Sequence, residues 1–375
     1  MPLLAEFFAD LGEIRRLPGR SMTAADVAGA DLLLVRSVTR VDAALLAAAR
    51  PRFVGSATIG TDHVDLAWLA GQGIPFAAAP GCNARAVAEY VSTVLALYAG
   101  QESVAVAGLR LGVVGCGHVG REVVRQAQAL GMPVAICDPL ADPAGLPADV
   151  PRLALDALLD WADVLTLHVP LADDGPHPTR HLLDAARLRR GRWRLLINTA
   201  RGPVVDNRAL SGLLAAEPGR AAVLDVWEAE PAVPPALLQR VRLGTPHVAG
   251  YSLEGKWRGT AMLYRAACRT LGIAPRVDLE AIRRARGDTP AVLPWAGTLA
   301  ETLAGVCDVP GDDRRLRAVV TADAAATAAA FDRLRRDYPE RREFAHYRLA
   351  GVPATDPQTK TPRAMLAALG FGLAD

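Results

Sequence analysis

The sequence lacks an excess of charge of either sign. Its 375 residues include 42 lysines and arginines against 40 aspartates and glutamates, a formal net charge of +2. This even balance gives no electrostatic reason to expect nucleic acid or an anionic membrane as a partner. No apolar run approaches the ~20 residues of a transmembrane helix, and the first residues show no basic segment followed by an apolar one. We therefore expect no nucleic acid partner, no membrane span and no secretory signal.

Cysteine is scarce, and its spacing shows no pairing. The five cysteines are Cys82, Cys116, Cys137, Cys268 and Cys307, an odd number without CxxC spacing. This pattern argues against a disulfide framework and a structural zinc site. No cluster of histidine, cysteine and aspartate has the spacing of metal ligands. We expect a chain without a bound metal, in a reducing cytoplasm.

Short apolar runs alternate with longer helical patterns over most of the chain. Continuous apolar runs of this length are typical of strands that are buried on both faces of a parallel sheet. Their alternation with helices predicts an α/β fold with a Rossmann-type, doubly wound parallel sheet. The predicted strands lie at residues 32–35, 53–55, 109–114, 134–137, 164–167, 195–198 and 222–224, and helices at residues 86–99, 121–130, 153–161 and 207–216.

The composition divides the chain into three predicted parts. We expect a substrate lobe at residues 1–92 plus 250–275 and a dinucleotide-binding domain at residues 93–249. After about Pro275 arginine and alanine dominate, which favours a separate small α+β module at residues 276–375. The charged run at residues 333–342 is by default the solvated face of a helix.

A GxGxxG motif consists of Gly115, Gly117 and Gly120, between a predicted strand and a predicted helix. In this context the first glycine permits a tight turn, the second lets the backbone approach a pyrophosphate, and the third lets helix and strand pack closely. The helix N-terminus offers free amides to the phosphates. Asp138 follows the next strand, where a carboxylate binds ribose hydroxyls and repels a 2′-phosphate. The motif therefore predicts a dinucleotide site that prefers NAD to NADP.

Arg201, Glu230 and His247 follow successive predicted strands near their carboxyl ends. Ligands bind at that edge of open α/β sheets. An arginine can clamp a carboxylate with two hydrogen bonds. A histidine can take a hydroxyl proton while hydride leaves the carbon, and a glutamate can orient the imidazole. These three residue types are the set that oxidation of a 2-hydroxy acid requires.

The motifs together resemble the D-2-hydroxyacid dehydrogenase family. The residues that carry this resemblance are NTARG at 198–202, DVWEAEP at 225–231 and TPHVAG at 245–250, behind GCGHVG at 115–120. Further segments are similar to one branch of that family, namely RSVT at 36–39, GTDHVD at 60–65, APGCN at 79–83, YSLEGKWRG at 251–259 and YPERRE at 338–343. The resemblance covers nearly the whole chain.

The resemblance implies a reaction, a cofactor and an assembly. The implied reaction is NAD-dependent oxidation of 4-phospho-D-erythronate to 2-oxo-3-hydroxy-4-phosphobutanoate, in pyridoxal 5′-phosphate (vitamin B6) biosynthesis. The implied substrate lobe is flavodoxin-like, and the C-terminal module is implied to form a homodimer. Arg201, Glu230 and His247 are implied to be catalytic, with His247 transferring the proton; Ser37, Thr58 and Tyr251 to bind substrate; and Asp138, Asp225 and Gly250 to bind NAD, with Gly115, Gly117 and Gly120.

A substrate with both a carboxylate and a phosphate needs two cationic anchors, of which Arg201 supplies one. Arg36, at the end of the predicted strand at 32–35, is one candidate for the second. Arg342 is another, because a two-fold partner could bring the C-terminal module to the neighbouring site. The alternative is that Arg341 and Arg342 only solvate a helix face.

The chain departs from the family pattern in two places. Val169 stands where the family has threonine near the cofactor, so a hydroxyl contact is expected to be lost. A first β-strand with a short loop has no counterpart before Met1. That strand would be central, so we expect either an upstream start site or neighbouring strands left unpaired.

Other interpretations remain open at this point. The chain could be another D-2-hydroxyacid dehydrogenase, of the phosphoglycerate or hydroxypyruvate type, a non-catalytic NAD-sensing scaffold, or an inactive truncated product. The remaining histidines are expected to be surface or structural residues, and Cys82 to serve packing; these histidines are His63, His118, His168, His177, His181 and His346.

Overall fold

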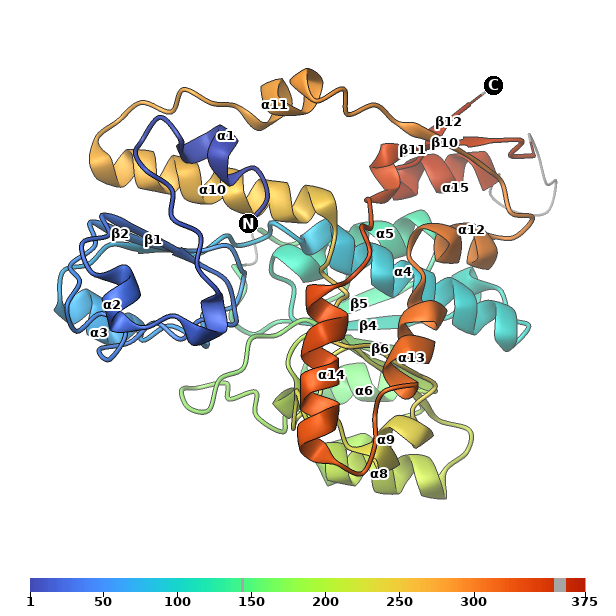
Figure 1. Cartoon of the computed structure of the whole chain (residues 1–375). Helices are drawn as coiled ribbons and strands as arrows, with labels where there is room; N and C mark the ends of the chain where they lie inside the picture. Colours follow the sequence, from blue (N-terminus) through green and yellow to red (C-terminus); the bar gives the residue numbers. More distant parts are fainter. Residues whose placement is uncertain (143–144, 354–361, 375) are drawn as a thin grey trace. The chain divides into compact units, whose positions relative to one another are not determined.

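The structure is a computed structural model that describes residues 1–142, 145–353 and 362–374 (Figure 1). The chain divides into two compact units. The first unit contains Met1–Asn83 and Ser252–Thr289, and the second contains Ala84–Tyr251 and Pro290–Asp375. Among the described residues, no helix combines the length and the apolar character needed to span a bilayer.

The first unit is built on a three-stranded parallel sheet of order β1-β2-β3. Its elements are β1 (Leu32–Val35), β2 (Phe53–Ser56), β3 (Phe76–Ala77), α1 (Leu4–Phe8), η1 (Gly19–Ser21), α2 (Ala24–Val27), α3 (Leu66–Gly71), α10 (Leu253–Leu271) and α11 (Leu279–Ala285). Both predicted strands, at 32–35 and 53–55, are confirmed. The expectation that they lack a partner is wrong, because β1 pairs directly with β2 and Leu32 is in register with Phe53.

The core of the first unit depends on aromatic packing between segments distant in sequence. Phe7 and Phe8 of α1 lie with their rings 5.3 and 5.5 Å from the ring of Tyr264 in α10. Contacts at this distance between aromatic rings add to the free energy gained from apolar burial. The N-terminal residues thereby join α10 in an apolar cluster that also contains Phe53 of β2.

The second unit contains the predicted doubly wound sheet, with six parallel strands in the order β5-β4-β6-β7-β8-β9. The strands are β4 (Leu111–Val114), β5 (Val134–Cys137), β6 (Val164–Leu167), β7 (Leu195–Asn198), β8 (Ala221–Leu224) and β9 (Leu243–Gly244). The chain runs outward from β4 to β5 and then crosses to β6 on the other side of β4. The strand order therefore reverses at β4, and ligands bind at the carboxyl edge next to such a reversal.

Helices cover both faces of this sheet. They are α4 (Ala84–Gln101), η2 (Val106–Gly108), α5 (His118–Ala129), α6 (Leu155–Trp161), α7 (Ala185–Arg189), η4 (Gly202–Val204), α8 (Asn207–Ala216) and α9 (Pro235–Arg240). Successive residues of a strand point to opposite faces. Ile197 of β7 accordingly packs in one apolar cluster with α4 and α5, whereas Leu196 packs in another with α6 and α8. Both faces are buried, which is why the strands are continuous apolar runs.

The C-terminal segment from Pro290 belongs to the second compact unit. Its elements are β10 (Ala291–Pro294), α12 (Leu299–Val306), α13 (Val309–Arg317), α14 (Ala324–Arg336), η5 (Phe344–His346), β11 (Tyr347–Ala350), α15 (Pro362–Leu369) and β12 (Gly372–Leu373), with the strands in the order β10-β11-β12. Leu303 and Phe344 lie in the same apolar cluster as Tyr90 of α4. These C-terminal residues therefore share a core with the dinucleotide-binding part.

The charged run at 333–342 is not a solvated helix face throughout. Helix α14 ends at Arg336, and Arg341 beyond it is only 6% exposed. Its guanidinium donates hydrogen bonds to the carbonyls of Ala86, at 2.7 Å, and Ala249, at 3.1 Å. The default interpretation is wrong for Arg341, because its side chain is buried and its Nη2 donates to two backbone carbonyls of other elements.

Candidate active site

The glycine loop between β4 and α5 has the geometry that its motif predicts. Gly115 has a φ of +89°, and a Cβ on Gly120 would clash with the carbonyl oxygen of Gly115. Both positions therefore exclude any side chain. A Cβ on Gly117, by contrast, would meet no atom within 4 Å. Gly117 thus borders open space at the start of α5, where its missing side chain leaves room for a pyrophosphate.

Asp138 lies beside this loop. One oxygen of its carboxylate accepts a hydrogen bond of 2.8 Å from the amide of Cys116, and the other accepts from the amides of Leu140 and Ala141 at 3.1 and 3.0 Å. These donors fix the carboxylate at the end of β5. Helix α5 begins without a side-chain cap at Gly117, so its first amides are offered to a ligand. The loop, the open helix end and the fixed carboxylate fit NAD.

Glu230 and His247 form a hydrogen-bonded pair after β8 and β9. The Nδ1 atom of His247 is 2.7 Å from Oε1 of Glu230. Burial acts to raise the pKa of Glu230, but the charge and hydrogen bond of His247 and the amide of Trp227 hold that pKa below its ordinary value. The carboxylate therefore stays ionised beside the imidazole. With Nδ1 bound in this way, Nε2 of His247 is the nitrogen that can exchange a proton with substrate.

His247 is held in a left-handed backbone conformation, with a φ of +57°. This conformation is costly for a residue with a side chain and persists only where the surroundings impose it. The amide of His247 donates to the carbonyl of Asp225 at 2.8 Å. The Asp225 side chain, 1% exposed, accepts from the amides of Val248 and Ala249 and from the hydroxyl of Thr245. Asp225 thus shapes the loop that carries His247 and Gly250.

Sequence reasoning missed the second layer of this loop. The hydroxyl of Thr245 also lies 2.8 Å from that of Tyr90 in α4, and the indole of Trp227 donates to the carbonyl of Thr245 at 3.0 Å. Thr245 and Trp227 are fully buried. Thr245 and Trp227 lie within the motifs at 245–250 and 225–231, and that position was the signal that could have found them. Nothing in the sequence links them to Tyr90, which is 155 positions from Thr245.

Arg201 lies in the turn that follows β7. Asn198 donates from its side chain to the carbonyl of Arg201 at 3.0 Å, which fixes the backbone of the turn. A Cβ on the next residue, Gly202, would clash with the carbonyl group of Trp227. The turn with Arg201 is therefore pressed against the segment that leads to Glu230, and only glycine permits this approach.

Val169 follows His168 after β6 and lies against the glycine loop. A Cβ on Gly115 would be 2.9 Å from Cγ1 of Val169. His168 is structural, as expected: its Nε2 lies 2.9 Å from the hydroxyl of Thr166, and burial lowers its pKa to about 3. The imidazole is therefore neutral at physiological pH.

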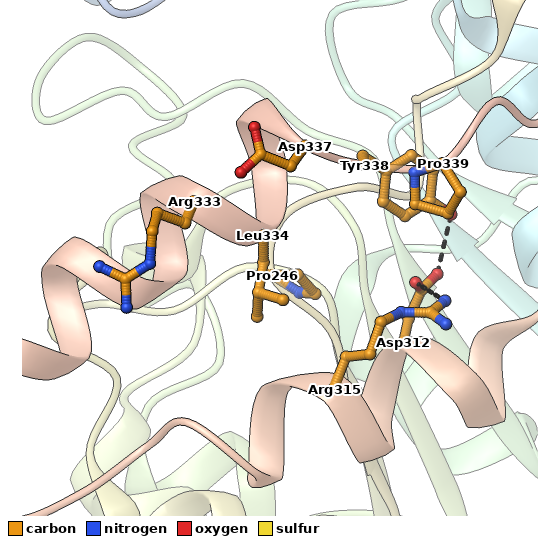
Figure 2. Close-up of a pocket in the computed structure, with 8 residues that line it drawn as sticks. All are labelled: Pro246, Asp312, Arg315, Arg333, Leu334, Asp337, Tyr338 and Pro339. Atoms are coloured by element: carbon orange, nitrogen blue, oxygen red, sulfur yellow. Dashed lines mark hydrogen bonds and ion pairs between the residues drawn. The ribbon is translucent and has the colours of Figure 1, made fainter.

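Tyr251 and Arg342, expected at the substrate, lie in the second unit. The ring of Tyr251 makes an edge-to-face contact of 5.6 Å with Tyr338, just beyond α14. A pocket of about 190 Å³ is lined on one side by Pro246, the residue before His247, and Figure 2 shows Arg333, Asp337 and Tyr338 around it as well. None of its eight lining residues is a predicted site residue, and two of them, Asp312 and Arg315, form an ion pair of 2.6 Å.

The remaining predicted substrate residues lie in the first unit. Arg36 and Ser37 form a turn at the end of β1, and Ser37 is exposed. The hydroxyl of Thr58 is 2.6 Å from that of buried Ser56, which is itself 2.8 Å from Nε2 of His63. Thr58 also donates to the carbonyl of Gly60 at 2.9 Å. His63 therefore has a structural part in orienting Thr58.

Within the described residues, no group of three histidine, cysteine, aspartate or glutamate side chains could hold a metal ion. All five cysteines are buried and free.

Comparison with known proteins matches two parts of the chain to family models. Residues 85–249 match the D-isomer specific 2-hydroxyacid dehydrogenase, NAD binding domain, and residues 293–370 match a domain of unknown function, DUF3410. The chain is 49% identical over 353 residues to an erythronate-4-phosphate dehydrogenase of Pseudomonas putida (strain W619), covering 92% of this chain and 91% of that protein. It is 48% identical over 351 residues to one of Marinobacter nauticus, with the same coverage of 92% and 91%.

Solved structures show the same fold. The TT0316 protein of Thermus thermophilus aligns with a TM-score of 0.60 at 27% identity, covering 73% of this chain and 95% of that chain. A D-lactate dehydrogenase of Aquifex aeolicus, complexed with NAD and lactic acid, aligns with a TM-score of 0.55 at 24% identity, covering 76% and 94%.

Proposed function

The chain belongs to the erythronate-4-phosphate dehydrogenases, within the D-isomer specific 2-hydroxyacid dehydrogenase family, and we propose that it oxidises 4-phospho-D-erythronate with NAD. The product is 2-oxo-3-hydroxy-4-phosphobutanoate. The observation that carries this proposal is the pair of His247 and Glu230, 2.7 Å apart, in the domain that contains the glycine loop.

NAD, when bound along the glycine loop, supplies the acceptor for the hydride that leaves the hydroxyl-bearing carbon. We assign the cofactor contacts to Gly115, Gly117, Gly120, Asp138, Asp225 and Gly250. Asp138 would bind the ribose hydroxyls, and its charge opposes the 2′-phosphate of NADP. Asp225 would act mainly through the loop that it shapes, because its carboxylate oxygens accept from that loop.

The proton released from the substrate hydroxyl is taken up by a side chain of the protein. His247 accepts the proton of the substrate hydroxyl on Nε2 and becomes an imidazolium. Glu230 holds the ring through Nδ1 and stabilises the positive charge that forms. Arg201 binds the substrate carboxylate with its planar guanidinium, which keeps the hydroxyl-bearing carbon in place.

We assign the rest of the substrate site to Ser37, Thr58 and Tyr251, and the phosphate to Arg36 and Arg342. Arg342 would act across a homodimer formed through the C-terminal module. We also place the reaction in the cytoplasm, where buried free thiols persist, and in pyridoxal 5′-phosphate biosynthesis. Disruption of the gene should then make growth depend on added pyridoxine.

The direct test is NADH formation by the purified protein. We expect absorbance at the NADH band to rise with 4-phospho-D-erythronate and NAD, and to stay flat with 3-phosphoglycerate. A rate with 3-phosphoglycerate equal to or above that with 4-phospho-D-erythronate would instead make the chain another member of the family.

A further inference from the structure

Helix α14 carries an arginine toward the residue that follows the catalytic loop. Phe331 and Arg335 are four residues apart and therefore share one face of this helix. Phe331 is fully buried. The guanidinium carbon of Arg335 lies 5.8 Å from the centre of the Phe331 ring and 5.9 Å from that of Tyr251. Arg335 is thus held by contacts with aromatic rings beside a predicted substrate residue.

Arg335 carries a buried donor that has no acceptor among the described residues. Its Nε is buried and has no hydrogen-bond partner within the described parts of the chain, where Arg335 also makes no ion pair. The next residue, Arg336, shows the ordinary arrangement, with its Nε 2.9 Å from Asp337 at the surface. A buried donor without an acceptor has a free-energy cost unless a ligand satisfies it.

The charge of Arg335 reaches the catalytic pair. Burial acts to raise the pKa of Glu230, and His247 and the amide of Trp227 act to lower it. The positive charge of Arg335 lowers the same pKa further, as a smaller contribution. The cation therefore lies within electrostatic range of the carboxylate that orients His247. An anion bound by Arg335 would be close to the reacting groups.

We propose that Arg335 is a phosphate anchor of the substrate site, held in place by Phe331 and Tyr251. The proposal rests on the proposed function, in which the substrate has two anionic ends and Arg201 binds the carboxylate. A guanidinium that is already ordered against aromatic rings presents its N–H groups in a fixed plane, which suits two parallel hydrogen bonds to phosphate. Arg335 is an anchor additional to Arg36 and Arg342, and it is supplied by the same chain as His247.

The test compares Arg335→Gln and Arg335→Lys with Arg336→Gln, a control one position away that removes an exposed arginine. Each is assayed with 4-phospho-D-erythronate and with D-erythronate, and inorganic phosphate is added as a competitor. We expect Arg335→Gln to lower kcat/KM for the phosphorylated substrate by roughly tenfold or more and for D-erythronate by less than about twofold. Inhibition by phosphate should weaken in parallel. Arg335→Lys should lie between wild type and Arg335→Gln, and the control should match wild type.

Two results would overturn the proposal. An equal loss with both substrates would mean that Arg335 acts through Glu230 or the carboxylate end, and unchanged inhibition by phosphate would remove it from the phosphate site. Calorimetric titration of wild type and Arg335→Gln with inorganic phosphate separates this proposal from the proposed function. Inactivity of wild type toward 4-phospho-D-erythronate would refute the function alone, whereas equal phosphate affinity of the two proteins would refute the anchor alone.

Discussion

At the scale of single residues, the site depends on where His247 is held. Its backbone is left-handed, its amide donates to the carbonyl of Asp225, and its Nδ1 lies 2.7 Å from Glu230. A strained residue maintained by several surrounding contacts is typical of functional sites. The strain therefore supports the assignment of His247 independently of its position in a motif.

Replacing His247 by glutamine should remove proton transfer and leave the cofactor site intact. Glutamine can still donate a hydrogen bond toward Glu230 but cannot accept a proton at neutral pH. We expect turnover to fall by roughly 10²–10⁴-fold, with NAD affinity unchanged. Steady-state kinetics and NAD titration measure the two effects, and near-normal turnover would exclude His247 as the base.

Asp138 should set the preference for NAD. Asp138→Ala removes the carboxylate at the end of β5, so NAD should bind more weakly and NADP should be rejected less. The measurement is the ratio of kcat/KM values for the two cofactors. If that ratio equals the wild-type ratio, Asp138 does not contact the ribose.

At the scale of elements, the histidine that directly follows β6 makes folding sensitive to acid. Burial lowers the pKa of His168 to about 3. Between this value and the ~6.5 of an unfolded histidine, the unfolded chain binds a proton that the folded chain does not. The stability contributed by this group is therefore complete above the unfolded pKa and falls as the pH falls.

The expected size is about 1.4 kcal/mol of unfolding free energy per pH unit below pH ~6.5. Urea denaturation of wild type and His168→Gln at several pH values measures it. The glutamine variant can keep a hydrogen bond to Thr166 but cannot take up the proton, so its stability should fall less steeply with acid. Parallel slopes for the two proteins would contradict a neutral, buried His168.

At the scale of the whole molecule, the C-terminal segment shares a core with the dinucleotide-binding part. Arg341 joins it to the carbonyls of Ala86 and Ala249, and the latter residue precedes Gly250. Removing the guanidinium would leave these buried carbonyls without a donor, which costs about 1–3 kcal/mol for each unsatisfied group. The next residue, Arg342, is the one that we propose to act across a dimer.

The Arg342 proposal is tested by Arg342→Ala in a protein whose assembly is monitored. A charged hydrogen bond to phosphate contributes ~1.5–3 kcal/mol, so KM for the phosphorylated substrate should rise by roughly tenfold or more. NAD affinity should not change, and light scattering should still give the mass of a dimer. If the variant is still a dimer and its KM is within about twofold of the wild-type value, Arg342 does not bind the substrate phosphate.

The sequence by itself determined the elements and the local motifs of this protein. Strands buried on both faces are predominantly apolar, so β4 to β8 are visible as nearly continuous apolar runs. Gly115 and Asp138 could be placed because strand, turn and helix follow one another along the chain. The ends of neighbouring parallel strands meet at one edge, which also made the pairing of Glu230 with His247 predictable.

Only the tertiary structure decided which distant residues surround that site. The burial of Arg341, the contact of Arg335 with Tyr251 and the support of Thr245 by Tyr90 join segments far apart in sequence. The direct pairing of β1 with β2 was missed for the same reason. Periodicity and motifs record which face of an element is buried, but not which other element covers it. That choice is made by the packing of side-chain volumes and by the need to satisfy every buried polar group.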